Sequence, residues 1–214
     1  IRDPAGQSRR LDLVREKIVL GRPDASMCAP AIGLIHLTVF NDETASAVHQ
    51  AVADLRRQGA AALVLDLRGA GGGPVSAIQQ VAGLFLPPGS ALWMLEKADG
   101  ERQLVRGGTP QGRLDLPLAV LVDRETQAAE LVAAAMKRNR RGSLIGHRTS
   151  GTAASKAWVK NPDGSSRLVP FGTFLLSPQD PITGAGVAPD TELPANAAPN
   201  DFVRAAIEAL QKGP

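Results

Sequence analysis

The run Gly69-Ala70-Gly71-Gly72-Gly73 is the first place where this sequence could do chemistry. It follows the apolar run from Ala61 to Leu67 and precedes Pro74, a residue type that favours the first turn of a helix. A glycine loop between a strand and a helix lets backbone N–H groups converge, and the helix dipole adds positive potential there. The loop therefore predicts a site for an anion or a developing oxyanion, while a tight turn that allows close helix–sheet packing would explain it equally well.

Other motifs that carry chemistry do not fit the sequence. Pro74 occupies the last glycine position of a dinucleotide fingerprint, and no Gly-Lys-Ser/Thr follows for a phosphate loop. His36, His49 and His147 have no metal-ligand spacing with one another or with Cys28, so structural roles are predicted for the histidines. The sequence has no Gly-x-Ser-x-Gly elbow. We therefore expect neither a metal nor a cofactor.

Apolar strands alternate with periodic helices along the sequence, and this alternation positions the loops. Strands are predicted at residues 31–40, 61–67, 116–122 and 144–145, helices at 44–58, 75–85, 126–138 and 201–211, and hairpin turns at 98–100 and 162–164. The pattern indicates an α/β fold with right-handed crossovers and a mostly parallel sheet. Residues 1–30 are more polar, with one short strand suggested by Leu11 and Leu13. We expect this segment to end an upstream unit and lead as a linker into a domain at residues 31–214.

Composition excludes several classes of protein. With 214 residues, 43% of them hydrophobic and 21% charged, the protein is long enough to bury a sizeable core. A net charge of +3, two Trp, five Phe and no Tyr give no signature of nucleic-acid binding. No apolar run is long enough to span a membrane.

Five landmarks occur in the order found in one family of proteases. They are Gly33 to Leu37, Leu65-Asp66-Leu67-Arg68 with Gly72-Gly73, Leu84 to Pro87, Leu116 to Val122, and Gly184 to Asp190. Together they resemble the tail-specific, or C-terminal processing, serine proteases. The resemblance implies an α/β crotonase/ClpP-like core with a mostly parallel sheet, flanking helices and short hairpins. It also implies an upstream PDZ domain, of which residues 1–30 would hold only the end, so we expect this sequence to be a piece of a longer protein.

The resemblance breaks down at the catalytic positions. The family uses a Ser–Lys dyad, and alignment on Glu130 puts Gln127 where the serine nucleophile is expected and Thr152 where the general-base lysine is expected. No serine lies between Ala91 and Gly142, and no lysine lies between Arg138 and Ser155, so the loss does not depend on the register. A carboxamide is no nucleophile, and a threonine hydroxyl is no base near neutral pH. Gly72 and Gly73 remain as the oxyanion or peptide-binding residues.

A rearranged dyad is the alternative. Thr126 could attack with Lys156 as its base, because some family members place a third catalytic residue at the position of Lys156. The competing interpretation is that Thr126 caps the following helix and Lys156 is solvated.

The sequence is therefore compatible with three functions. The first is a pseudoprotease that binds a peptide or a protein C-terminal tail, added as a strand near the glycine loop. The second is an active serine-type or threonine-type peptidase with a rearranged dyad, and the third is a binder of small apolar ligands on the same fold. The resemblance implies a periplasmic or otherwise exported setting.

Overall fold

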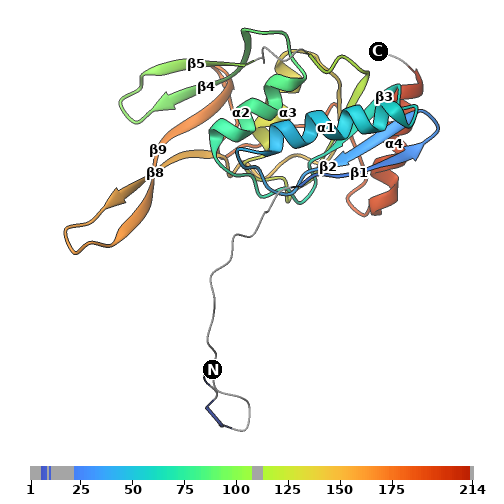
Figure 1. Ribbon diagram of the computed structural model, residues 1–214. Coiled ribbons are helices and arrows are strands. Elements are labelled where there is room, and N and C mark those ends of the chain that lie inside the picture. Colours follow the sequence, from blue (N-terminus) through green and yellow to red (C-terminus); the bar gives the residue numbers. More distant parts are fainter. Residues whose placement is uncertain (1–5, 9, 11–21, 108–112, 213–214) are drawn as a thin grey trace.

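The structure is a computed structural model, and it describes residues 6–8, 10, 22–107 and 113–212. Two β-sheets and four helices make up these residues, so the predicted α/β class is confirmed (Figure 1). The short strand predicted around Leu11 and Leu13 lies outside the described residues.

A six-stranded, mostly parallel sheet lies at the centre. In spatial order its strands are β1 (Asp24–Ala29), β2 (Ile32–His36), β3 (Ala62–Asp66), β6 (Leu118–Val122), β7 (Ser143–Gly146) and β11 (Thr191–Glu192). Neighbouring strands run parallel, except that β1 is antiparallel to β2. The carboxyl ends of β3, β6 and β7 therefore meet at one edge, and the loops that follow them are brought together there.

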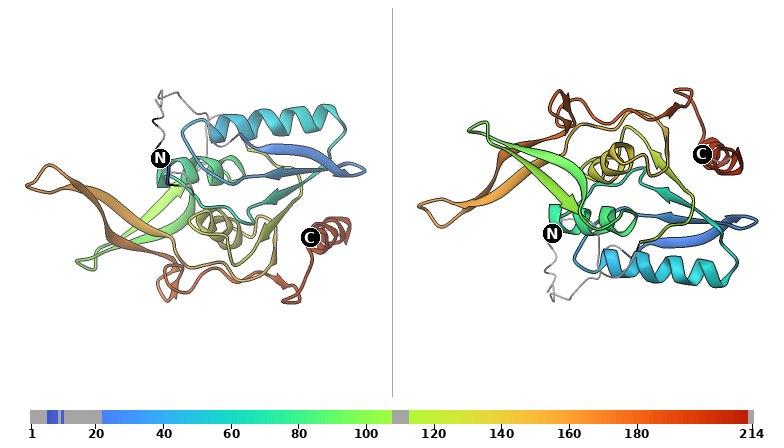
Figure 2. Two further views of the ribbon diagram at one scale, coloured as in Figure 1. Left: turned by 90° about the horizontal axis from the view of Figure 1, so that it is seen from below. Right: turned by 90° about the horizontal axis from the view of Figure 1, so that it is seen from above.

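Helices cover both faces of this sheet because its buried strands carry apolar side chains on both sides. They are α1 (Thr44–Arg57), α2 (Val75–Leu84), α3 (Glu130–Arg138) and α4 (Pro199–Lys212). On β6, Val120 packs into the large core shared with α1, α2 and α3, whereas Ala119 and Leu121 pack with Phe202 of α4. Figure 2 shows α4 on the opposite side of the sheet from the other three helices.

A second sheet is antiparallel and lies beside the first. It contains β4 (Ser90–Lys97), β5 (Arg102–Gly107), β8 (Ala154–Lys160), β9 (Ser166–Ser177) and β10 (Asp180–Pro181). The two hairpins predicted from sequence are its main parts, and β9 continues beyond its hairpin to pair with β4 and β10. The hairpin of β8 and β9 projects away from the body of the molecule (Figure 1).

The start of α3 differs from the prediction. Periodicity predicts a helix from Thr126, but α3 begins at Glu130. The Asp123 N–H donates to the Thr126 hydroxyl oxygen at 2.9 Å, and the Thr126 N–H donates to the Asp123 carbonyl at 3.1 Å. These bonds close a turn after β6, because a threonine side chain that binds the backbone locally competes with helix formation.

Strand β1 is also absent from the prediction. Its first three residues are exposed and its last three are only half-buried, so it lacks the buried apolar run that marks the inner strands. It is held by backbone pairing to β2, from Asp24 opposite His36 to Ala29 opposite Ile32. The sheet therefore includes residues that sequence alone predicts to be linker.

Candidate functional site

The glycine loop lies between β3 and α2, at the carboxyl edge of the central sheet. Gly72 has φ of +104°, a conformation that side chains rarely adopt. A Cβ atom at Gly72 would lie 2.5 Å from the Cβ of Ala128, so the loop packs directly on the turn that carries Gln127. The Gly72 carbonyl accepts the Phe40 N–H at 2.9 Å, and the Gly71 N–H donates to the Thr38 carbonyl at 3.0 Å. The positive φ and the contact with Ala128 thus require glycine at position 72, and a Cβ atom at Gly73 would lie 2.0 Å from the Phe40 carbonyl oxygen.

The turn between β6 and α3 carries the position expected for the nucleophile. Gln127 donates its backbone N–H to the Ala70 carbonyl of the glycine loop at 2.9 Å, and its side chain is exposed. Its carbonyl accepts the N–H of Glu130 at 2.8 Å, in a tight turn that leads into α3. The sequence places Gln127 at the helix start, but the structure places it just before the helix.

The loop after β7 carries the position expected for the base. Thr152 is exposed, and its hydroxyl shares a hydrogen bond of 2.7 Å with that of Ser150. The Ser150 N–H donates to the Thr126 carbonyl at 3.1 Å, which ties this loop to the turn of Gln127. The three loops that hold Gly72, Gln127 and Thr152 are therefore joined by contacts of the backbone.

The buried carboxylate of Glu130 holds the loop after β7, which carries Thr152, through hydrogen bonds. This carboxylate is fully buried and accepts hydrogen bonds from the Thr149 hydroxyl, from the Gly151 N–H at 2.8 Å and from the Ala153 N–H at 2.8 Å. Burial raises the pKa of Glu130 above its ordinary value, and these hydrogen bonds oppose the rise. The loop is thus shaped around one buried carboxylate.

The two groups of the rearranged dyad are not joined. The Thr126 side chain is 0% exposed, and its hydroxyl lies 2.9 Å from both the Leu67 carbonyl and the Asp123 carboxylate, to which it can donate. Lys156 is exposed on β8, opposite Pro170 of β9. No hydrogen bond joins Thr126 and Lys156, both of which are described. Thr126 closes the turn after β6, but the N-cap of α3 is Ala129, so the expectation that Thr126 caps this helix is wrong. Lys156 is exposed, as that interpretation expects.

Two of the histidines contact backbone or aromatic groups, and His49 lies exposed on α1. His147 is buried, with Nε2 3.1 Å from the Pro194 carbonyl and its ring edge-on to Phe202. His36 places Nε2 3.3 Å from the Arg68 carbonyl. Within the part of the sequence that the structure describes, no group of three or more His, Cys, Asp or Glu residues could hold a metal ion. None of the described helices is both long and apolar enough to span a membrane.

Two residues important for the site were not identified from sequence as organisers. Glu130 served only to align the sequence, although a lone acid within the apolar stretch from Ala128 to Met136 is a signal of a buried, paired carboxylate. Asp123 accepts the backbone N–H groups of Gly69 and Glu125, each at 3.1 Å, and so links the glycine loop to the turn after β6. An aspartate directly after a buried strand, three residues before a threonine, indicates such a turn.

Three comparisons agree on the family. The model described as Peptidase family S41 matches residues 31–193. The chloroplastic C-terminal processing peptidase of Tetradesmus obliquus is 31% identical over 209 residues, which cover 91% of this chain and 45% of that protein. The carboxy-terminal processing protease CtpA of Bacillus subtilis is 28% identical over 187 residues, which cover 86% of this chain and 40% of that protein.

The fold of this chain also matches that of a solved structure. A solved structure described as photosystem II D1 C-terminal processing protease superposes with a TM-score of 0.72 at 30% identity, over 95% of this chain and 57% of that one. This chain spans less than half the length of the two curated relatives. The resemblance stated from the five sequence landmarks is confirmed, and the protein belongs to peptidase family S41.

Proposed function

We propose that this domain binds extended peptides in the manner of a C-terminal processing protease but does not cleave them. The observation that carries the proposal is a pair of residues, one on the turn that packs against the glycine loop and one on the loop after β7 that is joined to this turn. Gln127 and Thr152 occupy the positions where the family resemblance calls for serine and lysine. Neither side chain supplies an activated nucleophile or a base near neutral pH.

The surroundings of these two positions support retained binding. The glycine loop packs on the turn of Gln127, and Glu130 holds the loop of Thr152 with three hydrogen bonds. An intact frame around substituted positions is what a pseudoprotease requires. Gly72 and Gly73 would then contribute a backbone surface for a peptide carbonyl.

The edge of β8 supports strand addition as the mode of binding. This strand begins two residues after Thr152, and among the described strands it pairs only with β9. An open strand edge offers backbone donors and acceptors to an extended peptide. Apolar side chains near this edge are exposed, including Trp158 at 72%, and a bound peptide would cover part of them.

The geometry disfavours a rearranged dyad. The Thr126 hydroxyl is buried and hydrogen-bonded to Leu67 and Asp123, and it has no hydrogen bond to Lys156. Attack by Thr126 would require these bonds to break and the turn after β6 to open. We therefore do not assign catalysis to this pair.

The relatives suggest the partner and the setting. Because the relatives are named for C-terminal processing, we propose that the bound segment is the C-terminal tail of a peptide or protein. From the family resemblance we further propose an upstream PDZ domain in the full-length protein and a periplasmic or otherwise exported setting.

Binding and turnover measured on one labelled peptide test this proposal. An unstructured peptide with a free, apolar C-terminus should bind saturably by fluorescence anisotropy, and mass spectrometry should find no fragments after long incubation. A matched variant with Gln127→Ala and Thr126→Ala sets the background. Turnover above that background would refute the non-catalytic assignment, and failure to bind any tail peptide would refute the binding assignment.

A further inference from the structure

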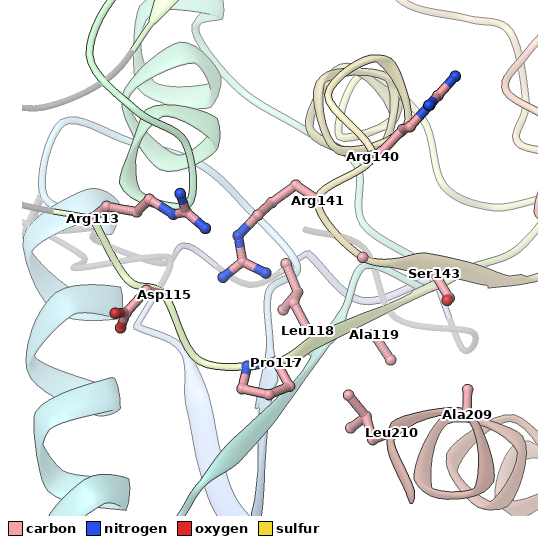
Figure 3. A pocket seen from close by; sticks show the side chains of 11 residues that line it. Arg113, Asp115, Pro117, Leu118, Ala119, Arg140, Arg141, Ser143, Ala209 and Leu210 are labelled. Carbon is pink, nitrogen blue, oxygen red and sulfur yellow. The ribbon is translucent and has the colours of Figure 1, made fainter. Parts of the chain in front are cut away.

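A cavity lies at the opposite edge of the central sheet from the candidate site. Its volume is about 270 Å³, and it opens beside Leu118 and Ser143, the first residues of β6 and β7 (Figure 3). Gln127 and Thr152 follow the other ends of these two strands. The cavity is therefore separate from the site described above.

Arg141 fixes one wall of this cavity. Its guanidinium donates from Nε to the Phe85 carbonyl at 2.9 Å and from one terminal nitrogen to the carbonyls of Leu114 and Leu116 at 2.7 and 2.8 Å. All three acceptors are neutral backbone oxygens, so they hold the side chain in place without neutralising its charge. The group is preorganised for an anion.

A second guanidinium faces the first. In Figure 3 the side chains of Arg113 and Arg141 point toward one another across the mouth of the cavity. Burial lowers the pKa of Arg141, and the nearby positive charge of Arg113 lowers it further. Contacts with backbone carbonyls explain the position of Arg141, but they do not explain why a second arginine faces it.

The carboxylate that lines the cavity is already engaged. Asp115 forms an ion pair with Arg56 at 3.0 Å, and in Figure 3 its carboxylate is turned away from Arg141. Among the described residues, no acidic side chain forms an ion pair with Arg113 or Arg141. The charge of Asp115 acts on Arg141 but is already paired with Arg56, so the two guanidinium groups leave a net positive charge at a partly enclosed site.

Much of the remaining wall is apolar. Its apolar part consists of Pro117 just before β6, Leu118 and Ala119 at the start of β6, and Ala209 and Leu210 from α4. Arg140, Gly142 and Ser143 complete the lining, and in Figure 3 the Arg140 side chain points away from the other two arginines. Figure 3 places Leu210 and Ala209 below the guanidinium groups, on the far side of Pro117. A ligand that fits both parts carries an anionic head and an apolar body.

We propose that this cavity binds a small carboxylate that carries an apolar group. The carboxylate lies between Arg113 and Arg141, where Arg141 can donate from the terminal nitrogen that no backbone carbonyl of the described residues occupies and Arg113 can donate from its guanidinium. The apolar group packs on Pro117 and Leu210. A volume of about 270 Å³ suits a ligand the size of one or two amino-acid residues. Two sources share this chemistry, namely the C-terminus of a polypeptide with an apolar last residue and a free short-chain fatty acid.

Isothermal titration calorimetry on the 214-residue protein tests the proposal with four probes. N-acetyl-leucine represents a polypeptide C-terminus, hexanoate represents a fatty acid, N-acetyl-leucinamide lacks the charge, and inorganic phosphate lacks the apolar group. We expect saturable binding of at least one of the two acids, with the amide and phosphate weaker by at least about tenfold. The tighter of the two acids identifies the source.

Single substitutions test whether the acid binds in this cavity. Arg113→Gln removes an exposed guanidinium that makes no hydrogen bond to the fold among the described residues, and it should weaken the acid at least about tenfold. Arg56→Gln frees the Asp115 carboxylate beside the cavity and should also weaken binding of the acid. Arg167→Gln, on the projecting hairpin, is the matched control and should change nothing. Binding of neither acid, equal binding of the amide or phosphate, or wild-type affinity in Arg113→Gln would overturn the proposal.

Discussion

The candidate site has a buried part and an exposed part, and the two differ in how firmly they are held. Glu130 and Thr126 are fully buried. Glu130 accepts three hydrogen bonds, and the Thr126 hydroxyl accepts one from the Asp123 N–H and can donate its single proton to the Leu67 carbonyl or the Asp123 carboxylate. Gln127 and Thr152 are exposed, and among the described residues the only bond from either side chain to the site is that of Thr152 to Ser150. The two positions that the family resemblance assigns to the dyad are the exposed ones. Under the non-catalytic function that we propose, a protease fold loses its reacting groups and keeps the frame that positioned them.

The largest effect is expected at Glu130. Replacing it by alanine leaves the Thr149 hydroxyl and the N–H groups of Gly151 and Ala153 without their acceptor in a buried setting. Each unsatisfied donor costs about 1–3 kcal/mol, so Glu130→Ala should lower the free energy of unfolding by at least about 3 kcal/mol. Urea denaturation followed by circular dichroism measures this loss. A loss below about 1 kcal/mol would show that the carboxylate does not organise the loop.

The second-largest loss of stability is expected for Gly72→Ala, with Gly69→Ala as its control. Gly72→Ala combines an unfavourable φ of +104° with a contact of 2.5 Å to Ala128, whereas Gly69→Ala has a positive φ of +64° and open space around it. We expect Gly69→Ala to cost about 1 kcal/mol and Gly72→Ala to cost more, about 2–4 kcal/mol. Denaturant midpoints of the two variants give the comparison. Equal losses would mean that the loop does not pack on the turn of Gln127 as described.

The pH dependence of stability tests the electrostatics of the buried part. Burial raises the pKa of Glu130 in the folded state above its unfolded value, so the folded state binds this proton more tightly. The contribution of this carboxyl to stability is therefore greatest at acidic pH. It declines as pH rises from the ordinary glutamate range through the raised pKa.

Glu130→Gln provides the control for this dependence because it removes the titrating group and keeps one acceptor oxygen. The difference in unfolding free energy between wild type and variant should shift against the wild type as pH rises through this window. Urea titrations at several pH values between about 4 and 8 measure the difference. A difference that shifts in favour of the wild type would mean that the hydrogen bonds outweigh burial.

The smallest effect is expected at the exposed positions. Gln127→Ala and Thr152→Ala should each change the free energy of unfolding by less than about 0.5 kcal/mol, because both side chains lie in solvent. Thermal denaturation of these two variants beside Glu130→Ala would show the contrast in one experiment. A large loss of unfolding free energy in Gln127→Ala would show that Gln127 belongs to the structural frame, which contradicts the distinction drawn between the buried frame and the exposed positions.

Sequence predicts the parts of this fold that depend on buried apolar patterns. The run from Leu118 to Val122 is buried at every position, and both the strand and its place in a parallel sheet follow from it. The start of α3 is mispredicted because the hydroxyl of Thr126 closes a turn that periodicity alone does not register. Strand β1 is missed because its order comes from backbone pairing with β2 and not from its own side chains.

The candidate site shows the same division. The glycine loop and the two substituted positions are visible in the sequence because a motif and an alignment point to them. The role of Glu130 is not visible, because its three partners come from a loop that follows the next strand. Which residues a buried carboxylate organises is a property of the tertiary structure.

Restoring the reacting groups and labelling the serine tests the central claim most directly. The frame around Gln127 and Thr152 is intact in this account, so the double variant Gln127→Ser with Thr152→Lys should stay folded. Its introduced serine should react with a fluorophosphonate at position 127, as detected by mass spectrometry of the labelled peptide. The wild type and each single variant should not react at that position, because nucleophile and base act as a unit. A folded double variant whose serine stays unlabelled would contradict the claim that the protease frame survives.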